Sequence, residues 1–89
     1  MSNSHLFPYM YKGDLLTGKT FDEYRTTGVY GIRIASNVPS DSPVNTSSLY
    51  GVLVVHVAPF VAQIAYLNNG NAYYRMYTNE SWSVWGQLC

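Results

Sequence analysis

The sequence predicts a mainly β protein: a small antiparallel sheet in a meander order, with one short helix. Apolar residues recur with a period of two over several short stretches, which is the pattern of strands with one buried face. Sequences rich in Gly, Asn, Ser and Pro separate these stretches, as turns do. A helix-start signal stands out at one place, Thr20 to Glu23.

The composition predicts an oligomer. The chain has 89 residues, the length of one domain, and a domain of this size has a modest core of its own. Charged residues make up 11% and aromatic residues 16% of the chain, whereas charged residues are about 25% of a typical soluble domain. Interfaces favour Tyr and Trp and disfavour Lys and Glu. We therefore expect part of the surface to be buried against another subunit.

The charge balance argues against a nucleic-acid partner. Five basic and five acidic residues give a formal net charge of zero, with no basic stripe to neutralise phosphates. No signal-peptide pattern is seen, and no stretch approaches the ~20 apolar residues that span a bilayer. We expect no membrane insertion. Cys89 is the single cysteine, so no intrachain disulfide is expected.

The first elements are an arm and a helix. Residues 1–19 show no clear period and are interpreted as an N-terminal arm or linker before a domain over residues 20–89. Thr20 and Glu23 have the spacing of a capping box, which predicts a short helix over Phe21–Thr26. Gly28 would then supply a left-handed C-terminal cap.

A strand and a long loop follow. From Val29 the alternation places Tyr30, Ile32 and Ile34 on one face of a strand, which we assign to the core. Residues 36–48 contain prolines and serines and predict a long loop, and loops of this length in a compact domain are often functional.

The segment LYGVLVVHV, residues 49–57, is apolar on both faces. Such a strand is covered on both sides. The cover on the face of Tyr50, Val52 and Val54 is either the helix with the arm or another subunit. These three residues are candidate subunit contacts.

Three more strands complete the sheet: residues 61–67, 71–78 and 82–88. Asn69-Gly70 between the first two predicts a type I′ hairpin turn. In a continuous last strand Trp82 and Trp85 have unlike parity and face opposite sides. Trp82 is in register with Val84 and Leu88 and is assigned to the core. Trp85 is then a candidate subunit contact, or a stacking plate for a sugar ring.

A candidate binding face lies on the strand over residues 71–78. Tyr73, Arg75 and Tyr77 share one parity, so a guanidinium could lie against two phenol rings. Aromatic faces stack on sugar C–H groups and Arg donates to hydroxyls or carboxylates, which makes this row a candidate glycan or receptor site. The alternative is a cross-strand ladder or a subunit contact.

The sequence indicates no enzyme, metal site or cofactor. His5 and His56 are far apart, and neither has a Cys or carboxylate at a metal-ligand spacing. Asp22 and Glu23 are adjacent, and Glu23 is assigned to the capping box, which argues against a glycosidase pair. No serine has a recognisable catalytic partner.

The ordered features resemble the knob domain of R-type pyocin tail fibres, a module of phage tail-fibre and tail-spike proteins. The matching residues over about 20–88 are FDEYRTTGVYGI with Gly28 and Tyr30, Asn37–Pro39, LYGVLVV, Gln63 and Tyr66, YYR ending at Arg75, and Trp82–Trp85.

The resemblance implies a homotrimeric, non-enzymatic β module in the tail of a phage or tailocin virion. Its partners would be other tail-fibre segments, and it would support or perform attachment to a bacterial surface glycan outside the cell. A monomeric carbohydrate-binding domain that uses the Tyr73, Arg75 and Tyr77 face is the alternative.

Overall fold

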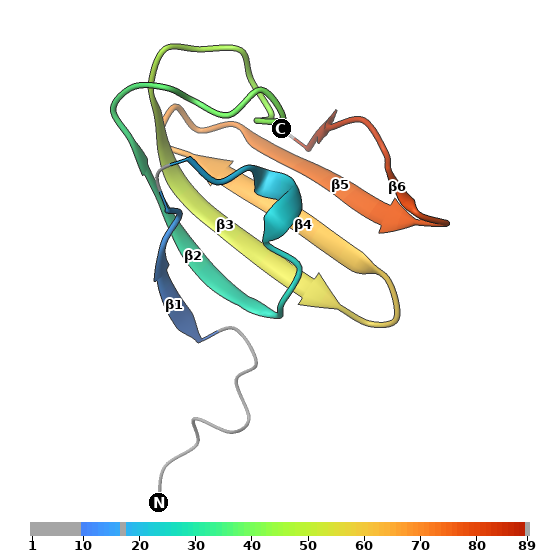
Figure 1. Ribbon diagram of the computed structural model, residues 1–89. Coiled ribbons are helices and arrows are strands. Elements are labelled where there is room, and N and C mark those ends of the chain that lie inside the picture. Colours follow the sequence, from blue (N-terminus) through green and yellow to red (C-terminus); the bar gives the residue numbers. More distant parts are fainter. Residues whose placement is uncertain (1–9, 17, 89) are drawn as a thin grey trace, which may run out of the picture.

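The computed structural model describes residues 10–16 and 18–88, which form one open, antiparallel-rich sheet with a single turn of 3-10 helix (Figure 1). The strands run β1-β2-β3-β4-β5-β6 across the sheet, and β7 also pairs with β5. Their bounds are β1 Tyr11–Asp14, β2 Gly28–Ile34, β3 Leu49–Val57, β4 Val61–Leu67, β5 Ala72–Thr78, β6 Ser81–Trp82 and β7 Gly86–Gln87.

The centre of the sheet is the antiparallel meander that the alternating pattern predicts. Tyr30 of β2 lies opposite Leu53 of β3, which lies opposite Ala65 of β4. Since successive side chains point to opposite faces, this register puts one parity of every strand on the same side. We call that side, over which the helical turn η2 (Phe21–Glu23) lies in Figure 1, the inner face, and the other the outer face.

The first strand lies inside the segment predicted to be an arm. Tyr11 pairs with Val29, and Asp14 with Gly31, in a parallel arrangement that shifts register between the two pairs. Gly13 has a φ of +102° within this strand, a value that glycine adopts readily. A strand of four residues with such an irregularity shows no period, which is why the sequence did not reveal it.

The hydrophobic core lies between the inner face and the segment that includes η2. Phe21, Leu53 and Val55 are completely buried, and burying a side chain of this size stabilises the fold by about 1.5–3 kcal/mol. The other buried members of the cluster are Leu15, Tyr30, Ile32, Leu49, Ala65 and Leu67, while Ile34 is half-buried against it. The inner face of the sheet is therefore committed to the chain's own core.

The helix is shorter than predicted because its carbonyls have other partners. The carboxylate of Glu23 accepts from the backbone N–H of Thr20 at 2.9 Å, as half of the predicted capping box requires. The turn ends at Tyr24, whose backbone leaves the helical region. Gln63 donates to the carbonyl oxygens of Phe21 and Tyr24, the acceptors that a longer helix would use. Gly28 begins β2 instead of capping a helix.

A type I′ turn forms in the β5–β6 hairpin and not at Asn69-Gly70, where the sequence predicts it. At Asn69-Gly70 only Gly70 has a positive φ, and the Gly70 N–H donates to the Leu67 carbonyl, so this is a three-residue loop that ends in a left-handed glycine. In the next turn both Asn79 and Glu80 have positive φ values, 53° and 64°. That pair connects β5 to β6 with type I′ geometry.

The predicted last strand is interrupted. Residues 83–85 leave the sheet between β6 and β7, and both short strands pair with β5. An argument from parity needs an unbroken strand, so it fails across this gap. Trp82 and Trp85 consequently contact the same inner-face residue, Arg75.

Candidate functional site

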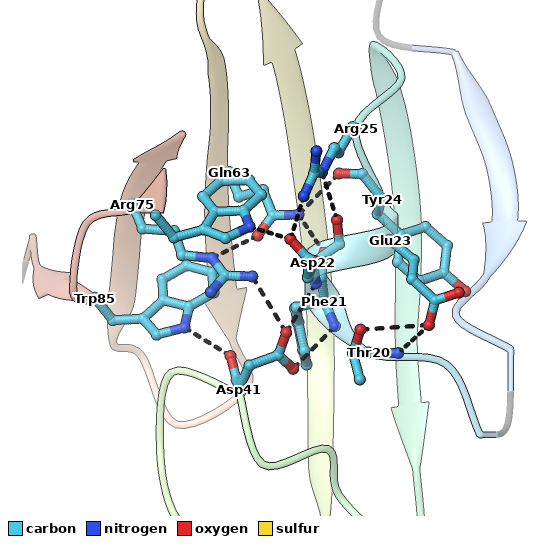
Figure 2. Close-up of polar contacts among 11 residues, drawn as sticks. Thr20, Phe21, Asp22, Glu23, Tyr24, Arg25, Asp41, Gln63, Arg75 and Trp85 are labelled. Atoms are coloured by element: carbon cyan, nitrogen blue, oxygen red, sulfur yellow. Dashed lines mark hydrogen bonds and ion pairs between the residues drawn. The ribbon is translucent and has the colours of Figure 1, made fainter. Parts of the chain in front are cut away.

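A polar centre built on Arg75 lies on the inner face of β5 (Figure 2). The Arg75 side chain is among the most enclosed in the molecule, with the residue only 5% exposed. Its Nε donates to Oε1 of Gln63 at 2.9 Å, and a terminal nitrogen lies 3.5 Å from Oδ2 of Asp41. A buried charge needs partners of this kind, because an unpaired one is very costly.

Both tryptophans stack on this guanidinium. The Arg75 Cζ lies 4.0 Å from the ring centroid of Trp82 and 4.7 Å from that of Trp85, within the range of cation–π attraction. Each indole N–H is also used: Trp82 donates to the carboxylate of Asp22, and Trp85 donates to the Asp41 carbonyl at 2.8 Å. The C-terminal segment is therefore held over Arg75 by two rings and two hydrogen bonds.

Gln63 joins the sheet to η2. It is completely buried on β4, opposite Arg75. Its Nε2 donates to the carbonyl oxygens of Phe21 at 2.6 Å and Tyr24 at 2.8 Å, while its Oε1 accepts from Arg75. Every polar group of this side chain has a partner, which is the condition for burying an amide at low cost.

Asp41 fixes the long loop, residues 35–48, to the same centre. Its carboxylate accepts from the backbone N–H groups of Phe21 at 3.0 Å and Asp22 at 2.8 Å. These amides are among the donors that the start of a helical turn leaves without internal partners. With its contacts to Arg75 and Trp85, Asp41 ties η2, the loop and the C-terminal segment together.

The electrostatics of the centre favour fixed charges. Burial lowers the pKa of the Arg75 guanidinium, and the nearby Asp41 carboxylate opposes that shift. The hydrogen bond from Arg25, and after it the one from Trp82, lowers the pKa of the Asp22 carboxyl below its usual value of 3.8. Arg25 in turn lies 4.1 Å from the ring centroid of Tyr77. This arrangement holds segments of the chain together.

The structure corrects the predicted binding face. Tyr73, Arg75 and Tyr77 do share one side of β5, but that side is the inner face, where η2 and the C-terminal segment cover Arg75. Both indoles contact the guanidinium, and Gln63 and Asp41 are its polar partners. The row is therefore not an exposed platform for a glycan.

The two tryptophans also need correction. Trp85, predicted to project away from the core, packs inside its own chain, with its ring edge-on to Phe21 at 5.9 Å between centroids. Trp82 is half-buried over the polar centre, beside Tyr77 at 5.2 Å, instead of lying in the apolar core.

The outer face of the sheet carries an apolar and aromatic row. By register Val52 lies opposite Tyr66, and Ile64 lies between Val54 and Tyr74. The members of this outer row are Tyr50, Val52, Val54, Ile64, Tyr66, Tyr74 and Met76; His56 follows Val54 on the same face of β3, opposite Ala62. Tyr66 is 50%, Tyr74 46% and Met76 42% exposed. Arg33 stands at the β2 margin, paired with Asp14 at 3.5 Å. The row that includes the predicted contacts Tyr50, Val52 and Val54 is thus uncharged and open.

A pocket lies at the end of the sheet where the long loop enters β3. Its volume is about 300 Å³, and it is bounded by the loop on one side and the β4–β5 turn on the other. Its walls include Val44, Thr46, Ser48, Tyr50, Asn68 and Asn69. A smaller hollow of about 110 Å³ adjoins it and shares Val44 and Thr46.

Among the described residues, no cluster of His, Cys, Asp or Glu is suited to hold a metal ion. The part of the chain that the structure covers also has no helix long and apolar enough to cross a membrane. His5 and Cys89 lie outside the described residues.

Sequence reasoning did not identify Asp41 or the role of Gln63. Asp41 stands in an irregular loop, and its partners are 19 to 44 positions away along the chain. A glutamine inside an apolar strand is the one local signal, because such a residue needs hydrogen-bond partners in the interior.

Comparisons with protein-family models, with curated proteins and with solved structures find no match for this chain.

Proposed function

We propose that this chain is a non-enzymatic module of a phage or tailocin tail fibre that assembles with copies of itself and helps to present or perform attachment to a host surface. The resemblance in sequence suggests the setting. The observation that carries the proposal is the outer row, which is apolar, aromatic and uncharged on a sheet whose other face is already covered.

The outer row has the composition of a subunit interface. Monomeric proteins rarely expose large contiguous apolar patches, and such patches mark interaction sites. Interfaces are enriched in Tyr and Met and depleted in charged residues. Tyr66 and Tyr74 supply large rings beside Val52 and Ile64 in the middle of the row. A homotrimer that buries this face would remove apolar area from water without desolvating a charge at its centre.

The polar centre supports this role by stiffening the module. Arg75, Gln63 and Asp41 join the sheet, η2, the long loop and the C-terminal segment through contacts inside one chain. A part that transmits load in a fibre benefits from such cross-links. The long loop, with its pockets, is then the place where an attachment module can contact a host surface.

Light scattering over micromolar concentrations tests the assembly. The chain has a mass of 10.0 kDa, so we expect a trimer of about 30 kDa, three times that value. Val52→Lys places a charge in the middle of the outer row and should give the mass of a single chain. Val84→Lys, the same change at a residue that is 88% exposed, serves as the matched control and should keep the trimer.

A mass of one chain for the wild-type protein would contradict the proposal. It would favour the alternative, a monomeric carbohydrate-binding domain, for which the pocket at the end of the sheet is the supporting observation. Equal masses for the two lysine variants would also count against the outer row as the contact. Circular dichroism of both variants checks that each change leaves the sheet folded.

A further inference from the structure

We infer that the pocket between the long loop and the β4–β5 turn, here called the end pocket, binds a neutral sugar residue. This inference rests on the proposed attachment function and names the ligand class for it. The end pocket is defined by Val44, Thr46, Ser48, Tyr50, Asn68 and Asn69, with the buried floor of the sheet beneath.

The uncharged lining of the end pocket favours a neutral ligand. Of the described residues that line the end pocket, none is Lys, Arg, Asp, Glu or His. A carboxylate, phosphate or ammonium group would lose its water there without gaining an opposite charge, and that exchange is unfavourable. The pocket therefore suits a neutral ligand and discriminates against an acidic sugar.

The polar groups of the lining match hydroxyl groups. A Ser or Thr hydroxyl both donates and accepts, and an Asn side chain offers two donors and one acceptor oxygen. Sugar hydroxyls also donate and accept. Within the described structure the side chains of Thr46, Ser48 and Asn68 form no hydrogen bond, so all three are available to a ligand.

The apolar part of the lining matches the C–H side of a sugar ring. Val44, Leu49, Tyr50 and Leu67 line the pocket beside these polar groups. The volume of about 300 Å³ is at the small end of the range for ligand pockets, about 300–1,000 Å³. That size fits one or two sugar residues better than a long chain.

The walls of the end pocket are held in place before a ligand arrives. The Asn68 N–H donates to the Tyr50 carbonyl at 3.0 Å, which links the turn to β3. Asn69 Oδ1 accepts from the Asn71 N–H at 3.0 Å, and the Ser42 hydroxyl donates to the Val44 carbonyl. A preformed site loses less conformational freedom on binding.

The test is a titration of the ¹⁵N-labelled full chain, followed by the shifts of its backbone amides. The neutral probes are the methyl glycosides of glucose, galactose, rhamnose and N-acetylglucosamine, and glucuronic acid is the charged probe. We expect at least one neutral probe to give saturable shifts confined to residues 44–50 and 67–69. Glucuronic acid should bind at least about tenfold more weakly, the change that a desolvated carboxylate without a partner would produce.

Paired variants locate the site. Thr46→Ala combined with Asn68→Ala should weaken binding at least about tenfold, because two hydrogen bonds of ordinary strength are lost. Thr26→Ala removes an exposed threonine far from the pocket and should leave binding unchanged. Tyr50 is left intact in this test because it also belongs to the outer row.

Three results would overturn the inference: no saturable shift with any neutral probe, binding of glucuronic acid as tight as that of the best neutral probe, or full binding by the double variant. These results are distinct from a failure of the assembly proposal. A trimer that binds none of the sugars keeps the assembly proposal and rejects the end pocket. A single chain that binds a neutral sugar rejects the assembly and keeps the pocket.

Discussion

Replacing Arg75 should destabilise the fold strongly, because the polar centre is structural. Arg75→Met keeps a long apolar stem but removes the charge and every donor. The partners of Arg75 are the side-chain amide oxygen Oε1 of Gln63, the carboxylate of Asp41 and the two indoles. The cost of the substitution in free energy of unfolding is the sum of the losses at these partners.

The largest loss is at Gln63, whose side chain is completely buried. Its Oε1 would be left without a donor, at a cost of about 1–3 kcal/mol. Two cation–π contacts at about 0.5–2 kcal/mol each are also lost. Asp41 keeps its two backbone donors, so its loss is small. These losses add to about 2–7 kcal/mol, and we expect a cost of about 3–5 kcal/mol, the range for breaking a buried pair by removing one partner.

This loss is a large part of the total, since about 0.05–0.15 kcal/mol per residue gives about 4–13 kcal/mol for a chain of this length. Urea unfolding followed by far-ultraviolet circular dichroism measures the change. Tryptophan fluorescence is unsuitable, because both indoles contact the altered side chain. Protein concentration is held constant, since assembly contributes to apparent stability.

Two companion variants make this prediction sharp. Arg33→Met removes an arginine whose side chain is 75% exposed and paired with Asp14, and should cost less than about 1 kcal/mol. Arg75→Lys keeps the charge but cannot place a planar group against the two indoles, and should still cost at least about 1.5 kcal/mol. A cost below about 1 kcal/mol for Arg75→Met, or one equal to that of Arg33→Met, would refute the structural role.

Two further predictions concern the turn at Asn79-Glu80 and the acid sensitivity of Asp22. Glu80 has a φ of 64°, which costs a non-glycine residue about 1–2 kcal/mol, so Glu80→Gly should stabilise by about 0.5–1 kcal/mol after the entropy of glycine is subtracted. Thermal unfolding should show a rise of about 2–8 °C; a fall would contradict the type I′ geometry. The pKa of Asp22 is lowered in the folded state, so its contribution is present above the unfolded pKa and is lost as pH falls through the folded pKa. Below about pH 4 the urea midpoint of Asp22→Asn should therefore decline less steeply than that of the wild type, and parallel curves would show that Asp22 contributes nothing.

The regular part of the fold was accessible from the sequence for a physical reason. The strands over residues 28–34, 49–57, 61–67 and 72–78 are long enough for the period of two to show which side chains share a face. Tyr30 and Ile32 are accordingly buried. A meander of consecutive strands also needs no long-range information beyond neighbouring turns.

The remaining features of the fold depend on contacts between segments that are distant along the chain, and local residue patterns do not predict such contacts. The alternation places Tyr73, Arg75 and Tyr77 together, but which face of β5 is covered depends on η2 and on the C-terminal segment. Residues 83–85 interrupt the strand. The side of the sheet to which Trp85 points therefore cannot be counted from Trp82 by simple alternation. Asp41 contacts segments that are distant along the chain, and no residue spacing in the sequence predicts these contacts.

Hydroxyl-radical footprinting of the assembled protein tests most directly whether other copies cover the outer row. In a single chain Tyr66 is 50% and Tyr74 46% exposed. Phe60, which lies in the β3–β4 turn outside the row, is 51% exposed and serves as the reference. We predict that both tyrosines are oxidised much more slowly than Phe60, after correction for the intrinsic reactivity of each ring, and that Val52→Lys restores their oxidation. Oxidation of Tyr66 and Tyr74 at the full rate expected for their exposure in the wild-type protein would contradict the account.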